Sequence, residues 1–197
     1  VEPYASSTCE MVAEILQYIV DKPKLKNIEA DAMYSGILVD TDNFVIKAGV
    51  RTFEAAAFLR RAGADVTRVR KMFREDMEHC RIRTAIINKA EIYMNEFAIS
   101  TFDGANVSGA TVVGAKAANA LLNIQGIRGS FVLTSLQDCI YISARSIDEL
   151  NVQVIMEKFN GGGHLTMAAA QLKNVTLEEA KQQLEDVLQQ MREDGDI

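Results

Sequence analysis

Residues 130–145, SFVLTSLQDCIYISAR, decide the fold of the second half of the chain. Two runs rich in β-branched and aromatic side chains, 130–135 and 139–145, stand on either side of Leu136-Gln137-Asp138, a gap of hairpin length. A third run of the same character covers 97–102. Because such side chains pack well on a pleated surface, all three runs predict β-strands.

Helical patterns lie between and after the predicted strands, at 112–122, 151–158 and 177–191. Strands mixed with helices in a stretch of this length are typical of a small α+β domain. We therefore expect an α+β domain over residues 96–197.

The first third of the chain shows only helical patterns. Apolar residues recur at helical spacing over 7–20 and 28–44, and a further helix follows Arg51-Thr52. Residues 1–75 are therefore expected to form a unit built of helices alone.

Charged residues interrupt apolar ones from Arg74 to Glu96, a pattern that predicts a long helix between the two units. We place this linker helix at 76–95. His79 lies in the charged stretch and is expected to face solvent.

Composition narrows the classes of function. With 197 residues, of which 48% are apolar, the chain can bury a globular core. A formal charge of -6 and a pI near 5.0 argue against a broad cationic surface for duplex DNA or an anionic membrane. Three scattered cysteines fit a reducing cytosol, and no apolar run is long enough to span a bilayer. The chain also lacks a Walker A loop, a nucleophile elbow and a zincin motif.

Gly161-Gly162-Gly163-His164 stands between a predicted helix and the small-residue run 168–170. Three glycines let the backbone approach a ligand and present amide hydrogens to phosphate, and the histidine can donate a hydrogen bond. The same glycines would also serve as a helix C-cap followed by a flexible turn. Composition alone leaves both interpretations open.

Asp40-Thr41-Asp42-Asn43 is an acidic cluster whose carboxylates could bind a hard divalent cation. It is not an EF-hand loop, because Val45 and Arg51 occupy the positions that require glycine and an acidic residue. Such residues are also common at solvated helix ends. A metal ligand and an ordinary helix end both stay open.

Three further polar groups each allow a binding and a structural interpretation. The guanidinium and hydroxyls of Ser143-Ala144-Arg145-Ser146 could contact phosphate, or belong to an ordinary ion pair at a strand end. Arg51-Thr52 precedes a helix and suits an anion contact or a simple cap. Ser6 and Ser7 stand where the first helix needs an N-cap.

The order of these motifs along the chain is more informative than any one of them. Together they resemble the DHH phosphoesterase family with its DHH-associated C-terminal domain, and within it the members that hydrolyse cyclic di-AMP. The resemblance covers essentially the whole chain. In order, the motifs are Pro3–Thr8, Gly36–Thr41, Arg51–Ala56, Ser143–Ser146, Asn151–Gln153 and Gly161–His164.

The resemblance implies a fold of α/β and α+β character. Residues 1–75 would be the mainly helical C-terminal part of a DHH domain, and residues 96–197 a small DHH-associated domain with a mixed sheet. In such enzymes the first domain carries two Mn²⁺ ions that activate a water for in-line attack on phosphorus, and the second holds the nucleotide.

The resemblance also implies roles for single residues. Asp40 resembles the last metal-ligating aspartate of the family, and with His164 it would be catalytic. The residues that would bind substrate are Ser6, Ser7, Arg51, Ser143, Arg145, Ser146, Gly161, Gly162, Gly163 and His164.

The family's other metal ligands and its Asp-His-His motif are expected before Val1, so the manganese site in this stretch would be incomplete. One carboxylate binds manganese weakly, because affinity and geometry come from several ligands held together. We therefore predict that this chain alone does not hydrolyse cyclic di-AMP. The resemblance also implies that its parent is a membrane-anchored protein with this part in the cytoplasm. Apolar surface exposed by the missing segment would favour a homodimer.

Three functions remain to be separated. The first is hydrolysis of cyclic di-AMP to the linear dinucleotide pApA. The second is hydrolysis of nanoRNA or other short linear oligonucleotides by a member of the same superfamily. The third is a binding module that holds a cyclic or short linear dinucleotide without catalysis. In none of them does this segment contact duplex DNA or a membrane.

Overall fold

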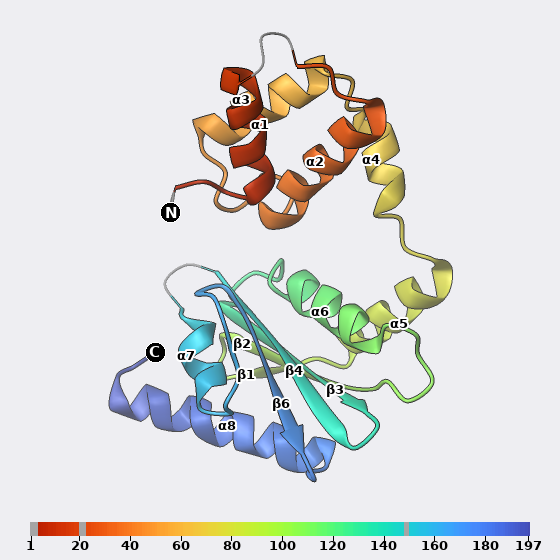
Figure 1. Ribbon diagram of the computed structural model, residues 1–197. Helices are drawn as coiled ribbons and strands as arrows, with labels where there is room; N and C mark the ends of the chain where they lie inside the picture. The colour runs from red at the N-terminus through yellow and green to blue at the C-terminus, as the bar shows by residue number, and fades with distance from the viewer. Residues whose placement is uncertain (1–3, 20–22, 148–149) are drawn as a thin grey trace. The chain divides into compact units, whose positions relative to one another are not determined.

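The computed structural model describes residues 4–19, 23–147 and 150–197, and the chain divides into two compact units, 1–75 and 76–197 (Figure 1). The mixed α/β character expected from the sequence is confirmed. None of the described helices combines the length and the apolar character that crossing a membrane requires.

The first unit is built of helices. Its core is lined by the buried side chains of Ile37, Leu59 and Val69, with several alanines between them. Gly36 lies inside a helix, at a point where a Cβ would come within 2.4 Å of the Cys9 sulfur. The glycine therefore lets two helices approach closely. The helices are α1 (Thr8–Ile19), α2 (Asn27–Asp40), α3 (Val50–Arg61) and α4 (Val66–Met72).

Helix α2 ends earlier than the helical pattern over 28–44 predicts. The Thr41 hydroxyl donates to the Ile37 carbonyl at 2.7 Å and accepts from the Phe44 backbone N–H at 2.9 Å. Asp42, Asn43 and Phe44 then all adopt positive φ angles, which an α-helix cannot continue. Asp40 is therefore the last residue of α2, near the end where the sequence predicts it.

The second unit contains a six-stranded mixed sheet in the order β1-β2-β3-β4-β6-β5. β2 and β3 are parallel and the other neighbouring pairs are antiparallel. The predicted hairpin is confirmed, since Leu136 pairs with Cys139 across a two-residue turn. The strands are β1 (Glu91–Tyr93), β2 (Phe97–Asp103), β3 (Gly129–Leu136), β4 (Cys139–Ser146), β5 (Gly162–Gly163) and β6 (Met167–Lys173).

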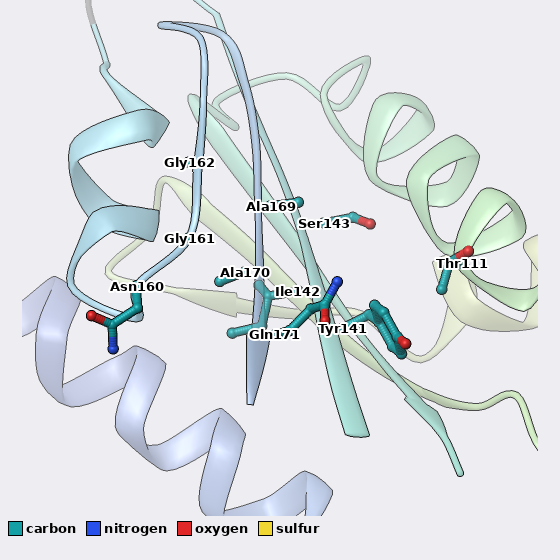
Figure 2. Close-up of a pocket in the computed structure, with 10 residues that line it drawn as sticks. All are labelled: Thr111, Tyr141, Ile142, Ser143, Asn160, Gly161, Gly162, Ala169, Ala170 and Gln171. Carbon is teal, nitrogen blue, oxygen red and sulfur yellow. The ribbon is translucent and has the colours of Figure 1, made fainter. Parts of the chain in front are cut away.

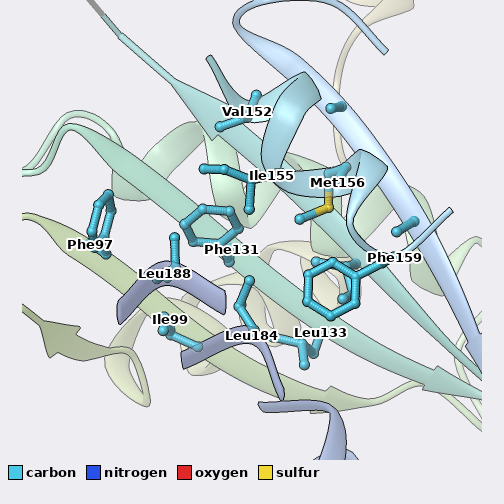
Figure 3. Packing of buried hydrophobic residues seen from close by; sticks show 14 of the residues in the cluster. Phe97, Ile99, Phe131, Leu133, Val152, Ile155, Met156, Phe159, Leu184 and Leu188 are labelled. Carbon is cyan, nitrogen blue, oxygen red and sulfur yellow. The ribbon is translucent and has the colours of Figure 1, made fainter. Parts of the chain in front are cut away.

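Helices cover both faces of this sheet (Figure 1). α5 (Met77–Asn88) and α6 (Ala110–Leu121) pack on one face, against side chains such as Ala98 and Val132. α7 (Val152–Glu157) and α8 (Leu177–Asp194) cover the other. Figure 3 shows Phe131 of that face among residues from both helices. Alternation along each strand thus sends neighbouring residues into two separate cores.

The long linker helix expected over 76–95 is not what the structure contains. α5 ends at Asn88, and Glu91–Tyr93 forms the edge strand β1, which turns through Met94 and Asn95 at positive φ to pair with β2. α5 is not a free connecting helix, because it packs against α6 and its Ile86 side chain is buried in the same cluster as side chains of α6. α5 and β1 therefore belong to the second unit.

Candidate functional site

A pocket of about 420 Å³ opens in the second unit beside strands β4 and β6 and the first turn of α6 (Figure 2). Its wall combines backbone from the glycine run with side chains that reach out from the sheet. The lining residues are Thr111, Tyr141, Ile142, Ser143, Asn160, Gly161, Gly162, Ala169, Ala170 and Gln171.

The glycine run is not the C-cap of α7. Asn160 takes the left-handed conformation with φ of 55°, and the Gly161 N–H then donates to the Met156 carbonyl at 2.9 Å, as in a Schellman cap. Gly162 and Gly163 form β5, which pairs with Ala169 and Ala168 of β6. The structure therefore answers one question that the sequence left open: Asn160 and the Gly161 N–H end the helix, and Gly162 and Gly163 form a strand of a hairpin.

The three glycines experience different surroundings. A Cβ at Gly161 would lie 2.3 Å from the Ala169 carbonyl oxygen, and one at Gly163 would lie 2.3 Å from the Met167 carbonyl oxygen. A Cβ at Gly162 would meet nothing within 4 Å, although Gly162 lines the pocket. Packing of the hairpin therefore explains the first and third glycines, whereas the second leaves open space beside the pocket.

His164 lies in the turn that joins β5 to β6. Its N–H donates to the Met167 carbonyl at 2.7 Å, and its side chain is exposed. His164 and Gly163 are not among the residues that line the pocket. The catalytic role that the sequence suggests for His164 stays a prediction.

Ser143, Arg145 and Ser146 do not share one face of the sheet. Ser143 lines the pocket, and Arg145 follows it two residues later on the same side of β4. Ser146 points to the other side, where its buried hydroxyl lies 2.7 Å from the Leu150 carbonyl and 3.2 Å from that of Leu165. The Ser146 hydroxyl thus ties loops together and does not face the pocket.

The Arg145 guanidinium is positioned by two acceptors. Nε donates to the Asn119 side-chain oxygen at 2.7 Å and Nη1 to the Ala144 carbonyl at 2.8 Å. Burial lowers the pKa of Arg145 from its ordinary value. The group nonetheless stays protonated at neutral pH, because an arginine titrates so far above it. A guanidinium has five N–H donors, so Arg145 retains hydrogen-bonding capacity for an anion.

Tyr141, Gln171 and Thr111 also line the pocket, although sequence reasoning did not identify them. Tyr141 precedes Ser143 by two positions on β4, Gln171 lies on β6, and Thr111 lies in the first turn of α6. The period of two along a strand was the available signal, since it places Tyr141 on the same face as Ser143. Nothing in the sequence alone pairs Tyr141 with Gln171.

In the first unit, Ser6 and Ser7 belong to the start of α1. The Glu10 N–H donates to the Ser7 hydroxyl at 3.0 Å, so Ser7 is the N-cap. The Glu10 carboxylate in turn accepts from the Ser6 N–H at 3.2 Å and from the Ser6 hydroxyl. Both serines are buried. A role for them in binding substrate stays a prediction.

Arg51 is bound to Glu14 of α1. Its Nε and Nη2 atoms donate to the two carboxylate oxygens at 2.7 and 2.6 Å, a bidentate pair. The hydrogen bond from Arg51 holds the pKa of the Glu14 carboxyl below its ordinary value of 4.5. An anion that bound Arg51 would have to compete with this carboxylate.

Asp40 is exposed at the end of α2, close enough to Cys9 that its charge acts on the thiol. Burial first, and then the Asp40 carboxylate, raise the pKa of Cys9. Within residues 4–19, 23–147 and 150–197, no group of three or more His, Cys, Asp or Glu side chains is placed to hold a metal ion. The donors described here therefore do not fit a complete manganese site, and Asp40 alone would contribute one ligand.

His79, which is expected to face solvent, is about 30% exposed and has two partners. Its Nδ1 lies 2.8 Å from the Asp76 carboxylate and its Nε2 lies 2.9 Å from the Ser108 carbonyl. The charged stretch is held to the second unit by these contacts, because Ser108 precedes α6.

The chain is similar in sequence to a known domain family and to characterised proteins. A family model described as the DHHA1 domain matches residues 97–193. Over 185 residues the chain is 47% identical to the cyclic-di-AMP phosphodiesterase PdeA of Listeria monocytogenes, covering 93% of this chain and 28% of that protein. It is 45% identical to the cyclic-di-AMP phosphodiesterase GdpP of Geobacillus thermodenitrificans, covering 98% of this chain and 30% of that protein. The chain thus spans less than a third of either relative.

Among solved structures, an exopolyphosphatase-related protein from Bacteroides fragilis is similar, with a TM-score of 0.86. The match covers 96% of this chain and 58% of that chain at 22% sequence identity. This likeness concerns the fold.

Proposed function

Because the chain belongs to the DHH phosphoesterases that carry a DHHA1 domain, we propose that it is the nucleotide-holding part of an enzyme that hydrolyses cyclic di-AMP to pApA. The observation that carries the proposal is 47% identity, over 93% of the chain, to a protein named for that activity. Residues 1–75 would be the C-terminal part of the DHH domain, and the DHHA1 domain would bind the dinucleotide.

The pocket beside β4 and β6 supports the binding half of this proposal. Gly162 leaves room for a ligand to approach the backbone, and Ser143 offers a hydroxyl from the same wall. Arg145 stands next along the strand with donors that suit phosphate oxygens. His164 would add a donor from the hairpin turn.

A complete metal site for this enzyme requires ligands in addition to the residues described. In the proposed enzyme Asp40 is one ligand of a manganese site, and the ions supply charge neutralisation and an activated water when bound. The described donors do not hold such an ion by themselves, so we propose that this chain alone is inactive and that a longer protein is required.

The test is hydrolysis of cyclic di-AMP with manganese by this chain and by a version extended at its N-terminus, each with and without Asp40→Ala. We expect pApA to form only in the extended protein and to disappear with Asp40→Ala. Turnover by the 197-residue chain at the rate of the extended protein would refute the requirement for a longer chain.

The same assay separates cyclic from linear substrates. Faster hydrolysis of pApA than of cyclic di-AMP by the extended protein would favour an oligonucleotide phosphodiesterase. Binding of either dinucleotide without hydrolysis in the extended protein would favour a non-catalytic module.

A further inference from the structure

Tyr141 of β4 and Gln171 of β6 lie directly opposite each other in the antiparallel ladder. Both residues line the pocket. Their side chains lie on the face of the sheet that α6 covers, because the side chains of their neighbours Ile142 and Ala170 are buried in the core on the opposite face. Figure 2 shows the tyrosine ring beside the Gln171 carboxamide, with Thr111 of α6 beyond the ring. An aromatic ring and a carboxamide therefore stand side by side in one wall.

The carboxamide of Gln171 is available to a ligand. Gln171 is exposed, and no hydrogen bond between its side chain and another residue occurs within the part of the chain that the structure describes. A carboxamide that faces a pocket presents one acceptor and two donor hydrogens in a single plane. This combination is suited to a flat ligand whose edge also carries both a donor and an acceptor.

Polarity changes along β4 from one end of this face to the other. Arg145, with its guanidinium, stands four residues from Tyr141, a separation of about 13 Å at the usual rise of a strand. Ser143 lies between them and lines the pocket. The face thus runs from a cationic group suited to phosphate, past a hydroxyl, to an uncharged ring and carboxamide.

We propose that Tyr141 and Gln171 form the base-recognition end of the pocket, where the ring packs on a nucleobase and the carboxamide reads its edge. The inference rests on the proposed function, since it assigns specificity within the same nucleotide site. Gln171 is the residue that selects the base, and Tyr141 contributes affinity for any base, because every base has a face that can stack.

The chemistry of Gln171 makes a directional prediction. The Watson–Crick edge of adenine carries the N6 amino donor and the N1 acceptor, and a carboxamide matches both with one donor and one acceptor. The same edge of guanine carries two neighbouring donors at N1 and N2, beside the O6 acceptor. A carboxylate accepts only, so glutamate at position 171 suits guanine and places negative charge against N1 of adenine.

The experiment is calorimetric titration of the 197-residue chain with pApA and with pGpG, comparing the parent chain with Gln171→Glu. Gln125→Glu is the matched control, because Gln125 is exposed in the same unit, is not among the residues of the pocket, and receives the same change of charge. Tyr141→Ala tests the ring. Thermal melting of each variant verifies that it is folded.

We expect Gln171→Glu to shift the ratio of pApA to pGpG affinity toward pGpG by about ten- to a hundredfold, the discrimination usual for one bidentate base contact. Gln125→Glu should leave the ratio unchanged. Tyr141→Ala should weaken both ligands to a similar extent, without changing the ratio. The ratio is informative because the added charge repels both phosphorylated ligands alike.

A Gln171→Glu variant that melts like the parent chain and keeps the parent ratio would overturn the inference while leaving nucleotide binding in place. A ratio shifted equally by Gln125→Glu would also overturn it, since the effect would then be one of net charge. If the parent chain bound neither dinucleotide, the proposed function would fail, and the inference with it.

Discussion

Gly162 pairs with Ala169 in the β5–β6 ladder, at a point where a Cβ on residue 162 would meet no atom within 4 Å. The glycine on either side has no such space, because a Cβ there would press against a backbone carbonyl of β6 at 2.3 Å. A glycine that the packing does not require, beside a pocket, indicates that the open space itself has a use.

Because only Gly162 has free space beside it, substitutions in the glycine run should affect folding at one position and ligand binding at another. Gly162→Leu should fill the pocket side of the hairpin and weaken pApA binding at least about tenfold, while the free energy of unfolding changes by no more than about 0.5 kcal/mol. Gly161→Ala should lower the free energy of unfolding by about 1–3 kcal/mol, because backbone must shift to admit the methyl group. Titration calorimetry and urea unfolding measure the two effects. Equal loss of stability in both variants would contradict the assignment.

Ser143 and Ser146 provide a second pair of matched substitutions. Ser146→Ala should lower the free energy of unfolding by about 1–3 kcal/mol, because it removes the hydroxyl that bonds the Leu150 carbonyl in a buried place. Ser143→Ala should leave stability unchanged within about 0.5 kcal/mol and weaken pApA binding about two- to tenfold. The same calorimetric and urea measurements apply. A stable Ser146→Ala protein with impaired binding would reverse the two roles.

Arg145 is expected to supply charge to the phosphate end of the pocket. Arg145→Ala should weaken pApA binding about ten- to a hundredfold and make the remaining affinity less sensitive to salt, because a charge-assisted bond to phosphate is lost. Arg145→Lys should recover only part of the affinity, since lysine cannot reproduce the fork that also holds Asn119. Titrations at low and high salt test this. Unchanged salt dependence in Arg145→Ala would place the phosphate elsewhere.

The lowered pKa of Asp31 in the first unit should make the stability of that unit depend on acid pH. It is buried, accepts from Arg68 Nε and from the Asp65 N–H at 2.7 Å each, and the hydrogen bond from Arg68 holds its pKa below the ordinary value of 3.8. For a lowered carboxyl pKa, the stabilisation is present above the unfolded value and is lost as pH falls through the folded value. The first unit should therefore weaken progressively below about pH 4.

The urea midpoint of the first unit, followed from neutral to acid pH, measures this effect. Asp31→Asn should lower the midpoint at neutral pH and flatten its dependence on pH in the acid range, whereas the exposed Asp196→Asn should do neither. An acid dependence as steep in Asp31→Asn as in the parent chain would show that other carboxyls control it.

How far the sequence predicts this structure depends on the range of the contacts involved. The strands 130–135 and 139–145 and their hairpin were predictable, because composition and a short turn are local. β6 was missed because Ala168, Ala169 and Ala170 have little intrinsic preference for a strand, and its pairing with β4 is a long-range contact. Edge strand β1 was missed because the charged residues that precede it, such as Arg83 and Lys89, made the stretch up to Glu96 resemble one long helix.

In the candidate site, too, some features set by local sequence were predictable, whereas those set by long-range pairing were not. The period of two along β4 was sufficient to separate Ser146 from Ser143 and Arg145, since residues an odd number apart face opposite sides. The cap at Asn160 was not predictable, because the three glycines beside it favour a left-handed conformation more strongly. The pair Tyr141–Gln171 depends on the register between two strands some thirty residues apart, which no local pattern specifies.

The most direct test of the central claim is a ¹H–¹⁵N correlation spectrum of the 197-residue chain titrated with pApA. The account predicts that shifts gather at the pocket: the Gly162 amide, the Gln171 side-chain amide and the backbone around Ser143. Shifts concentrated instead at the Arg51–Glu14 pair, or no shifts at any ligand concentration, would contradict the claim that this pocket holds the nucleotide.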